Sequence, residues 1–320
     1  MTATADQFPD AAGADHAVEG RQANLWRDTL RSLLRQRSAV VGLFLLTTLF
    51  LVAIFAPVIA THPPNQSMLE LGEDVSRQRP DTLAPCIHLL GCAAERPEHY
   101  FGLDGNVRDT FSRVVYGARV SLYIGFVTVG FAIVIGAALG AVAGYAGGRT
   151  DNLIMRAMDV VLSFPSLLLA ITIVTVLGPG LVNAQIAIGI VAIPIYARVM
   201  RASVLSIRER DFVTASRALG ESSSGLLLRR IVPNAITPLI VQGTLGIGGA
   251  IIEVAALSFI GLGAQPPLAE WGSMIAIDRT IMTVAPHLII FPGAAITLTV
   301  LGFNLLGDGL RDALDPRLNR

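Results

Sequence analysis

The stretch Val120–Gly144 reads VSLYIGFVTVGFAIVIGAALGAVAG and contains no charged residue. A hydrocarbon core about 30 Å thick is crossed by a helix of about 20 apolar residues. This stretch therefore predicts a membrane-spanning helix. It is also rich in glycine, and small residues let membrane helices approach each other closely. The composition favours a packed helical bundle over an isolated anchor.

Five further stretches of the chain have the same apolar character. They cover Ser38–Ala60, Ala157–Leu177, Leu181–Val204, Pro238–Leu262 and Ala285–Leu306. The first of these is too long for the core of a signal peptide, and too many residues precede it, so we expect it to stay as an anchor. The sequence thus predicts an all-α membrane protein with six transmembrane helices.

Composition limits the chemistry that this chain can carry. Of its 320 residues, 52% are hydrophobic and 15% are charged, and the net charge of zero indicates no nucleic-acid partner. All 24 basic residues are arginine. A phosphate-binding P-loop and a Schiff-base enzyme each need a lysine, so we expect neither here, and no cofactor. If ATP drives this protein, another subunit binds the ATP.

The segments outside the apolar stretches are polar. Residues 1–20 predict a disordered cytoplasmic tail. Residues 21–37 predict an amphipathic juxtamembrane helix, which either contacts lipid headgroups or is solvated. Residues 61–119 predict an external loop, residues 120–310 a five-helix core, and residues 311–320 a cytoplasmic tail.

Arginine placement predicts the orientation, because cytoplasmic loops carry an excess of basic residues. With the N-terminus inside, 17 of the 24 arginines lie in segments predicted to face the cytoplasm. Six of the other seven lie in the long 61–119 loop, where the rule weakens with loop length. We therefore expect both termini to be cytoplasmic.

The longest predicted internal connection, Arg198–Pro233, reads RVMRASVLSIRERDFVTASRALGESSSGLLLRRIVP. Gly220 is placed to end one helix, and the serines after it can cap another. The pattern predicts a helix, a turn and a second helix over residues 205–233, projecting as a knob suited to a soluble partner. An ordinary loop remains the alternative.

Part of this connection resembles a known motif. The letters D-F-V-T-A-S-R-A-L-G followed by R-R-I-V-P-N resemble the cytoplasmic EAA loop of ABC importer permeases. In that family the loop sits in a cleft of the ATPase subunit and transmits its closure. Thr214 stands where the motif has glutamate, and Ser216 where it has the second alanine. The resemblance implies a docking site made of Asp211, Thr214, Ala215, Ser216, Arg217, Gly220, Ile231 and Pro233.

Three other stretches resemble the C-type permease subunit of dipeptide, oligopeptide and nickel ABC importers. They are Phe101–Leu122, Leu257–Gly272 and Gly302–Arg317. Val107 replaces a glycine of the family signature, which predicts a different local turn. The resemblance implies a type I ABC importer permease fold in the bacterial cytoplasmic membrane. It also implies a sister permease subunit, two ATP-binding subunits, an external solute-binding protein and surrounding lipid as partners. The implied cargo is peptide, with nickel or another small solute as the alternative.

Three residues are candidates for the transport pathway. Glu253 is the only acidic residue deep in its apolar stretch, and a charge inside the membrane is usually functional or paired. It either meets the amine end of a peptide or forms a structural pair. Asp159 is expected to pair with an arginine near the membrane interface. Pro165 predicts a kink beside the pathway.

The 61–119 loop holds both cysteines of the chain, Cys86 and Cys92. A disulfide is the preferred interpretation, since disulfides persist outside the cytoplasm. Free thiols and a metal site with the nearby His88 and His99 remain open. Further on, Trp271 and Met274 predict an amphipathic segment that acts as a gate, a docking surface or an interface anchor.

Two other classes of function fit the sequence less well. An ion-coupled secondary transporter usually carries several ionisable groups mid-membrane, whereas this chain has essentially one. Such transporters also often show paired broken helices, which the sequence does not suggest. An intramembrane enzyme lacks any recognisable motif here. The sequence therefore favours a permease subunit that is driven by separate ATPases.

Overall fold

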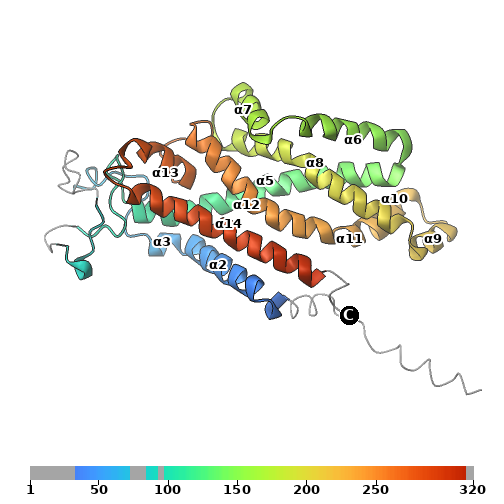
Figure 1. Ribbon diagram of the computed structural model, residues 1–320, viewed down its shortest axis with the longest axis horizontal. Helices are drawn as coiled ribbons and strands as arrows, with labels where there is room; N and C mark the ends of the chain where they lie inside the picture. The colour runs from blue at the N-terminus through green and yellow to red at the C-terminus, as the bar shows by residue number, and fades with distance from the viewer. Residues whose placement is uncertain (1–32, 73–83, 93–96, 315–320) are drawn as a thin grey trace, which may run out of the picture.

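The computed structural model describes residues 33–72, 84–92 and 97–314, which form an elongated bundle of helices (Figure 1). Predictions for residues 1–20 and for most of 21–37 lie outside these ranges. Five described helices are long and apolar enough to cross a membrane: α2 (Arg37–Ile54), α5 (Thr110–Ala146), α8 (Leu181–Arg208), α12 (Thr237–Phe259) and α14 (His287–Leu314). A sixth crossing exists if α6 (Gly148–Leu162) and α7 (Ser166–Leu177) act together. The all-α membrane fold is confirmed.

The third predicted span is not one continuous helix. The axes of α6 and α7 differ by 90°, and the break falls at Ser163–Pro165. Pro165 has no N–H to donate and adopts an extended conformation, with ψ 127°, immediately before α7. The expected kink at Pro165 is therefore a full break, and the helix before it starts at Gly148 rather than at Ala157.

Short helices close the two ends of the bundle (Figure 1). At one end, here called the knob end, lie α9 (Asp211–Ala218), α10 (Ser223–Gly225), the π-helix η4 (Leu226–Ile231) and α11 (Val232–Ala235). At the opposite end, here called the loop end, lie α3 (Ala56–Ile59), η3 (His88–Leu90), α13 (Trp271–Asp278) and η5 (Arg279–Ile281). Between them α5 packs on α8, α12 packs on α5, α8 and α14, and α2 packs along α14.

Several predicted boundaries differ from the observed ones. The first span divides at Phe55 into α2 and α3. The second begins at Thr110, ten residues before the apolar stretch, because Asp109 caps α5 by accepting a hydrogen bond from the Ser112 backbone N–H at 2.8 Å. The predicted external loop thus ends at residue 109. The last helix continues to Leu314, into the predicted tail.

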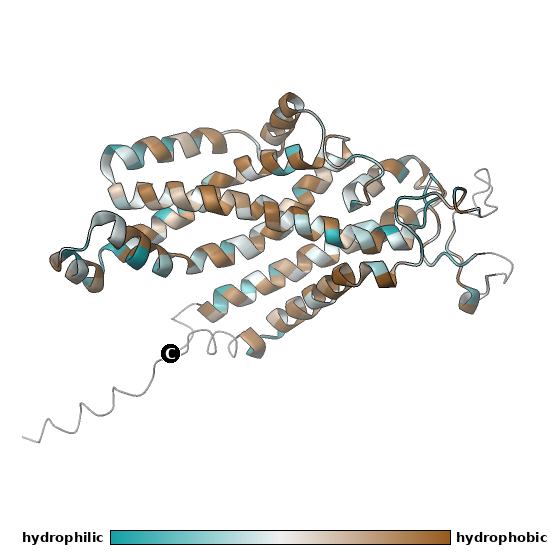
Figure 2. Ribbon diagram, turned by 180° about the vertical axis from the view of Figure 1, so that it is seen from behind, coloured by the Kyte–Doolittle hydropathy of each residue, from teal (hydrophilic) through white to brown (hydrophobic). Residues whose placement is uncertain are grey.

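Hydrophobic residues predominate along the long helices in Figure 2, and many of their side chains are exposed. Val176 is 83% exposed, Leu153 74% and Val134 70%. So many highly exposed apolar side chains on one surface are unfavourable in water. In a bilayer the same side chains contact lipid tails or a neighbouring subunit, as the membrane fold requires.

Glycines set the distance between α5 and α8. Gly136, Gly140 and Gly144 recur every four residues on the face of α5 that meets α8. A Cβ on Gly136 would lie 2.7 Å from the Ile193 carbonyl oxygen, and one on Gly140 would overlap the Ala197 carbonyl. The glycines of Val120–Gly144 thus allow the backbones of α5 and α8 to touch.

Replacing Gly140 by valine should therefore push α5 and α8 apart. Overpacking of this kind costs about 1–3 kcal/mol, and thermal unfolding of the purified protein in detergent measures it. Gly130→Val is the matched control, because a Cβ on Gly130 meets no atom within 4 Å. Equal loss of stability in both variants would contradict the close-approach argument.

Candidate functional site

The knob is built by local signals in the sequence. Gly220 has a φ of +83°, the left-handed conformation that glycine adopts without strain, and it turns the chain after α9. The Ser222 hydroxyl accepts a hydrogen bond from the Gly225 N–H at 3.3 Å and so caps α10. The helix–turn–helix predicted over residues 205–233 is present in this form.

Buried side chains hold the knob on the bundle. Val213, Leu226 and Ile231 are at most 1% exposed and belong to the main hydrophobic core. Arg208 donates a hydrogen bond to the Gly144 carbonyl at 2.9 Å, which ties the end of α8 to the end of α5. The knob is therefore a firm extension of the bundle.

One side of α9 presents apolar groups to the outside. Phe212, Ala215 and Leu219 are spaced by three and four residues, so they share one side of the helix. Leu219 is 89% exposed and Phe212 40% exposed. Phe212 and Leu219 were not among the predicted docking residues, whereas Ala215 was. The remaining predicted residues are exposed at Asp211, Thr214, Arg217, Gly220 and Pro233, half-buried at Ser216 and buried at Ile231.

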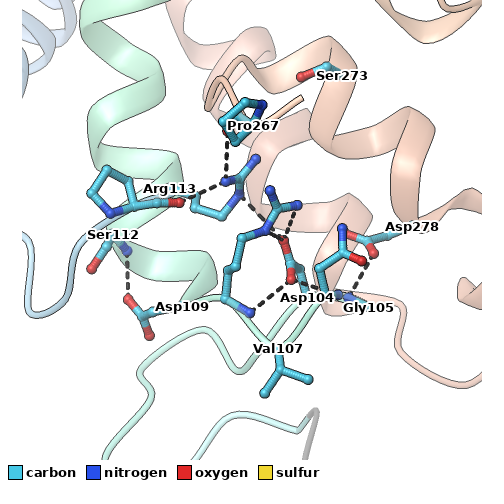
Figure 3. A network of polar contacts seen from close by, with 12 residues as sticks. Asp104, Gly105, Val107, Asp109, Ser112, Arg113, Pro267, Ser273 and Asp278 are labelled. Atoms are coloured by element: carbon cyan, nitrogen blue, oxygen red, sulfur yellow. Dashed lines mark hydrogen bonds and ion pairs between the residues drawn. The ribbon is translucent and has the colours of Figure 1, made fainter. Parts of the chain in front are cut away.

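A buried polar network holds the loop end together (Figure 3). The Asp104 carboxylate accepts a hydrogen bond from Arg108 Nε at 2.8 Å and lies 3.4 Å from Arg113 Nε. Arg113, which is 0% exposed, also donates to the carbonyls of Pro64 at 2.7 Å and Pro267 at 3.3 Å. One guanidinium thus connects three segments that lie far apart in the sequence.

Val107 lies in the turn between Asp104 and Arg108. Its φ is +60°, in the left-handed region that favours glycine. The Val107 N–H donates to the Asp104 carbonyl at 2.8 Å, and the side chain packs with Met68 and Leu103. Valine is therefore held in a conformation that glycine adopts more readily.

Helix α13 is buried against the bundle. Glu270 caps it by accepting hydrogen bonds from the Gly272 and Ser273 N–H groups at 2.9 and 2.8 Å. Trp271 is 1% exposed and donates from Nε1 to the Val114 carbonyl at 3.0 Å. The indole ring is thus a core residue, and the interpretation of Trp271 as an interface anchor is wrong.

Asp278, at the end of α13, accepts a hydrogen bond from the Gly105 N–H at 3.0 Å (Figure 3). Burial raises the pKa of Asp278 from 3.8 to about 6, and the charge of Asp104 acts in the same direction. The Gly105 hydrogen bond and the charges of Arg108 and Arg113 oppose this rise in pKa. The folded state therefore favours the protonated form of Asp278 more than the unfolded state does.

A raised carboxyl pKa means that the stability contributed by the proton is lost as the pH rises from about 4 to 6. Asp278→Asn removes the charge and keeps an acceptor for Gly105. We expect this variant to be more stable than the parent protein at pH 7.5, by up to about 3 kcal/mol in the free energy of unfolding, and so to unfold at a higher temperature. Its stability should also change less with pH between 4 and 6. The exposed Asp312→Asn serves as the control. A variant less stable than the parent protein at pH 7.5 would show that the Asp278 charge is favourable.

Pro165 and Glu253, two of the candidate pathway residues, lie near each other. Ser166, which follows Pro165, contacts Glu253 of α12 through its hydroxyl at 3.5 Å. Asp159 lies apart from them and pairs with Arg198 of α8, not with its sequence neighbour Arg156. Both side chains of this pair are more than half exposed.

The cysteine-containing loop is closed by a disulfide between Cys86 and Cys92, whose Cα atoms are 5.3 Å apart. Cys86 and His99 exchange two backbone hydrogen bonds of 2.9 Å. His99 Nδ1 contacts Asp109 Oδ1 at 3.0 Å, whereas His88 contacts Glu98. Among the described residues of this loop, neither a cysteine nor His88 joins His99 in a group that could hold a metal ion.

Comparison with known proteins identifies the family. Residues 136–320 match the family described as "Binding-protein-dependent transport system inner membrane component", and residues 24–85 match "N-terminal TM domain of oligopeptide transport permease C". The chain belongs to the binding-protein-dependent permease family. It is therefore a multi-pass inner-membrane subunit of an ABC transporter and not a catalytic ATPase. Systems of this kind work with an ATPase and a binding protein.

Individual relatives cover nearly the whole permease. The dipeptide transport system permease protein DppC of Alkalihalophilus pseudofirmus is 46% identical over 92% of this chain and 90% of its own length. The di/tripeptide permease DppC of Pseudomonas aeruginosa is 43% identical over 90% and 91%. The glutathione permease GsiD of Escherichia coli is 43% identical over 92% and 91%.

A solved structure supports the fold of this permease. The inward-facing MetNI methionine ABC transporter superposes with a TM-score of 0.52 over 64% of this chain and 98% of that chain. The sequence identity is 20%, so this likeness concerns the fold alone.

Proposed function

We propose that this permease forms half of an ATP-driven import channel for short peptides, with both of its termini in the cytoplasm. The observation that carries this proposal is the exposed apolar side of α9 on a rigid knob, next to arginine-rich helix ends. Phe212, Ala215 and Leu219 together form an exposed apolar surface, and a surface of this kind is typical of a protein–protein contact. The arginine excess of this end favours its placement in the cytoplasm, where the ATPases are.

The knob docks on an ATPase subunit and receives its closing motion. The chain contains no lysine with which to build its own P-loop, so the ATP is bound by partner subunits. Ile231 and Val213 anchor the knob to the core, and Arg208 links it to α5. A push on α9 is therefore transmitted to the long helices and not absorbed by a flexible loop.

A sister permease covers the side of the bundle that carries α6, α7 and part of α12. The Asp159–Arg198 pair is exposed on this side, and charged groups facing lipid are unfavourable. An apolar groove of about 410 Å³ lies nearby, lined mainly by Leu167, Ile171, Ile252, Ala255, Phe259 and Ile275. Pairing of two such faces would place the polar groups beside a shared pathway.

Short peptides are the cargo class that the relatives favour. Two of these relatives carry dipeptides or di- and tripeptides by name, and the third carries glutathione, itself a small peptide. Glu253 and Ser166 supply an acceptor and a hydroxyl beside the groove. These groups suit the amine end of a peptide, and the external binding protein makes the finer choice.

Reconstitution in lipid vesicles tests the proposal. Uptake of a labelled dipeptide should require this permease, its sister subunit, the ATPases, the binding protein and ATP together. The permease alone should move no peptide. If an ion gradient drives peptide uptake by the chain alone, the protein is instead an ion-coupled transporter.

A further inference from the structure

Three potential metal ligands meet at the loop end, beside the network of Figure 3. They are His62, which follows α3, His99, whose backbone pairs with Cys86, and Asp109, which caps α5. One ligand atom from each lies within 4.8 Å of the other two. Asp109 Oδ1 is 3.0 Å from His99 Nδ1 and 4.0 Å from His62 Nδ1. The centroids of the two imidazole rings are 5.1 Å apart.

We propose that His62, His99 and Asp109 bind a divalent transition-metal ion of the Zn²⁺ type. Two imidazoles and one carboxylate form a donor set that suits zinc, with water as the fourth ligand. Bonds of about 2.0–2.1 Å in a tetrahedron place the ligand atoms about 3.3 Å apart. The separations from Asp109 Oδ1 are 3.0 and 4.0 Å, and all three ligand atoms lie within 4.8 Å of one another, so the side chains must move closer together to complete the site.

The surroundings orient the carboxylate toward the imidazoles. Asp109 Oδ2 accepts hydrogen bonds from the Ser112 N–H at 2.8 Å and the Thr61 hydroxyl at 3.4 Å. These bonds leave Oδ1 directed to the two rings. Oδ1 is thus placed to bind a cation together with the two imidazoles.

Access and position indicate what the ion does. The side chains of Asp109 and His99 are 0% and 5% exposed, whereas that of His62 is 22% exposed and provides the entrance. A bound ion would join the segment after α3, the start of α5 and, through the Cys86–His99 backbone pair, the disulfide loop. The site would therefore fasten the disulfide loop onto the bundle.

Metal binding to the purified, assembled transporter tests this assignment. After treatment with a chelator, the complex is dialysed against Zn²⁺, and bound metal and unfolding temperature are measured. The parent complex should bind one more Zn²⁺ per copy of this chain than the His62→Ala variant, whose affinity at this site should fall at least about 10–100-fold. Zn²⁺ should raise the unfolding temperature of the parent complex but not that of the variant.

His88→Ala is the matched control, because His88 lies on the same loop but contacts Glu98. It should bind Zn²⁺ like the parent complex. His62→Asp supplies an oxygen ligand in place of the imidazole nitrogen, so it should recover part of the affinity that His62→Ala loses. Co²⁺ gives a second readout, since the parent complex should show a visible spectrum that His62→Ala lacks. Equal Zn²⁺ binding by the parent and His62→Ala complexes, or equal loss in His62→Ala and His88→Ala, would overturn the proposal.

Discussion

Leu219→Arg should release the ATPase subunits from this permease and abolish peptide uptake, while the chain still inserts in the membrane. Leu219 is 89% exposed on the knob, so the substitution leaves the core intact. In the assembled transporter it would place an unpaired charge in an apolar contact, at a cost of about 3–5 kcal/mol. Such a cost corresponds to more than about 100-fold in affinity. Co-purification of the ATPases and uptake in cells measure the effect.

Leu89→Arg is the control for this substitution. Leu89 is 94% exposed at the opposite end of the molecule, so the Leu89→Arg variant should still bind the ATPase subunits. Ala215→Asp lies on the same side of α9 as Leu219 and should repeat the loss. Gly220→Pro should do so by another route, since proline cannot adopt the φ of +83° at that turn. Normal uptake in all three knob variants would show that no partner docks there.

Arg113→Met should destabilise the folded protein more than Gly140→Val does. The guanidinium is fully buried and neutralises part of the Asp104 charge, and its NH groups satisfy the carbonyls of Pro64 and Pro267. Removing one partner of a buried ion pair costs up to about 3–5 kcal/mol. Arg108 still pairs with Asp104 in this variant, so the lost hydrogen bonds to Pro64 and Pro267 make up part of the cost. Thermal unfolding in detergent should therefore shift well below that of the parent protein.

Arg119→Met is the matched control, since Arg119 lies on the same helix with its side chain exposed. The double variant Asp104→Asn with Arg113→Met should recover part of the loss, because the two residues interact directly. If Arg113→Met is as stable as Arg119→Met, the buried network does not hold the loop end together.

Apolar runs in the sequence predicted the spans, but not where the helices begin and end. The first turns of α5 contain the polar Thr110, Ser112 and Arg113, which suggest a loop when read in sequence. They are helical because Asp109 caps them and α13 and the preceding loop bury them. The place of the break at Pro165 follows from the proline itself, but the 90° angle between α6 and α7 is a tertiary feature, with α7 packed against α8. The sequence therefore predicts a kink at Pro165 but not its size.

The knob was more predictable than the loop end. Its turn depends on Gly220 and Ser222, which are local signals. The network of Asp104, Arg113 and Asp278 joins residues as much as 173 positions apart in the chain. The cluster of His62, His99 and Asp109 likewise forms only when three separate segments meet. The Glu270 cap of α13 was also missed, because glutamate is not among the residues usually found at helix N-caps.

Accessibility of residue 223 tests most directly whether the knob is a cytoplasmic handle for the ATPases. Ser223 is exposed beside α9, and both cysteines of the chain are joined in a disulfide, so a Ser223→Cys variant carries a single reactive thiol. A membrane-impermeant maleimide should leave this thiol unlabelled in intact cells and label it once the membrane is opened. Labelling of Ser223→Cys from outside intact cells would invert the topology and contradict the account.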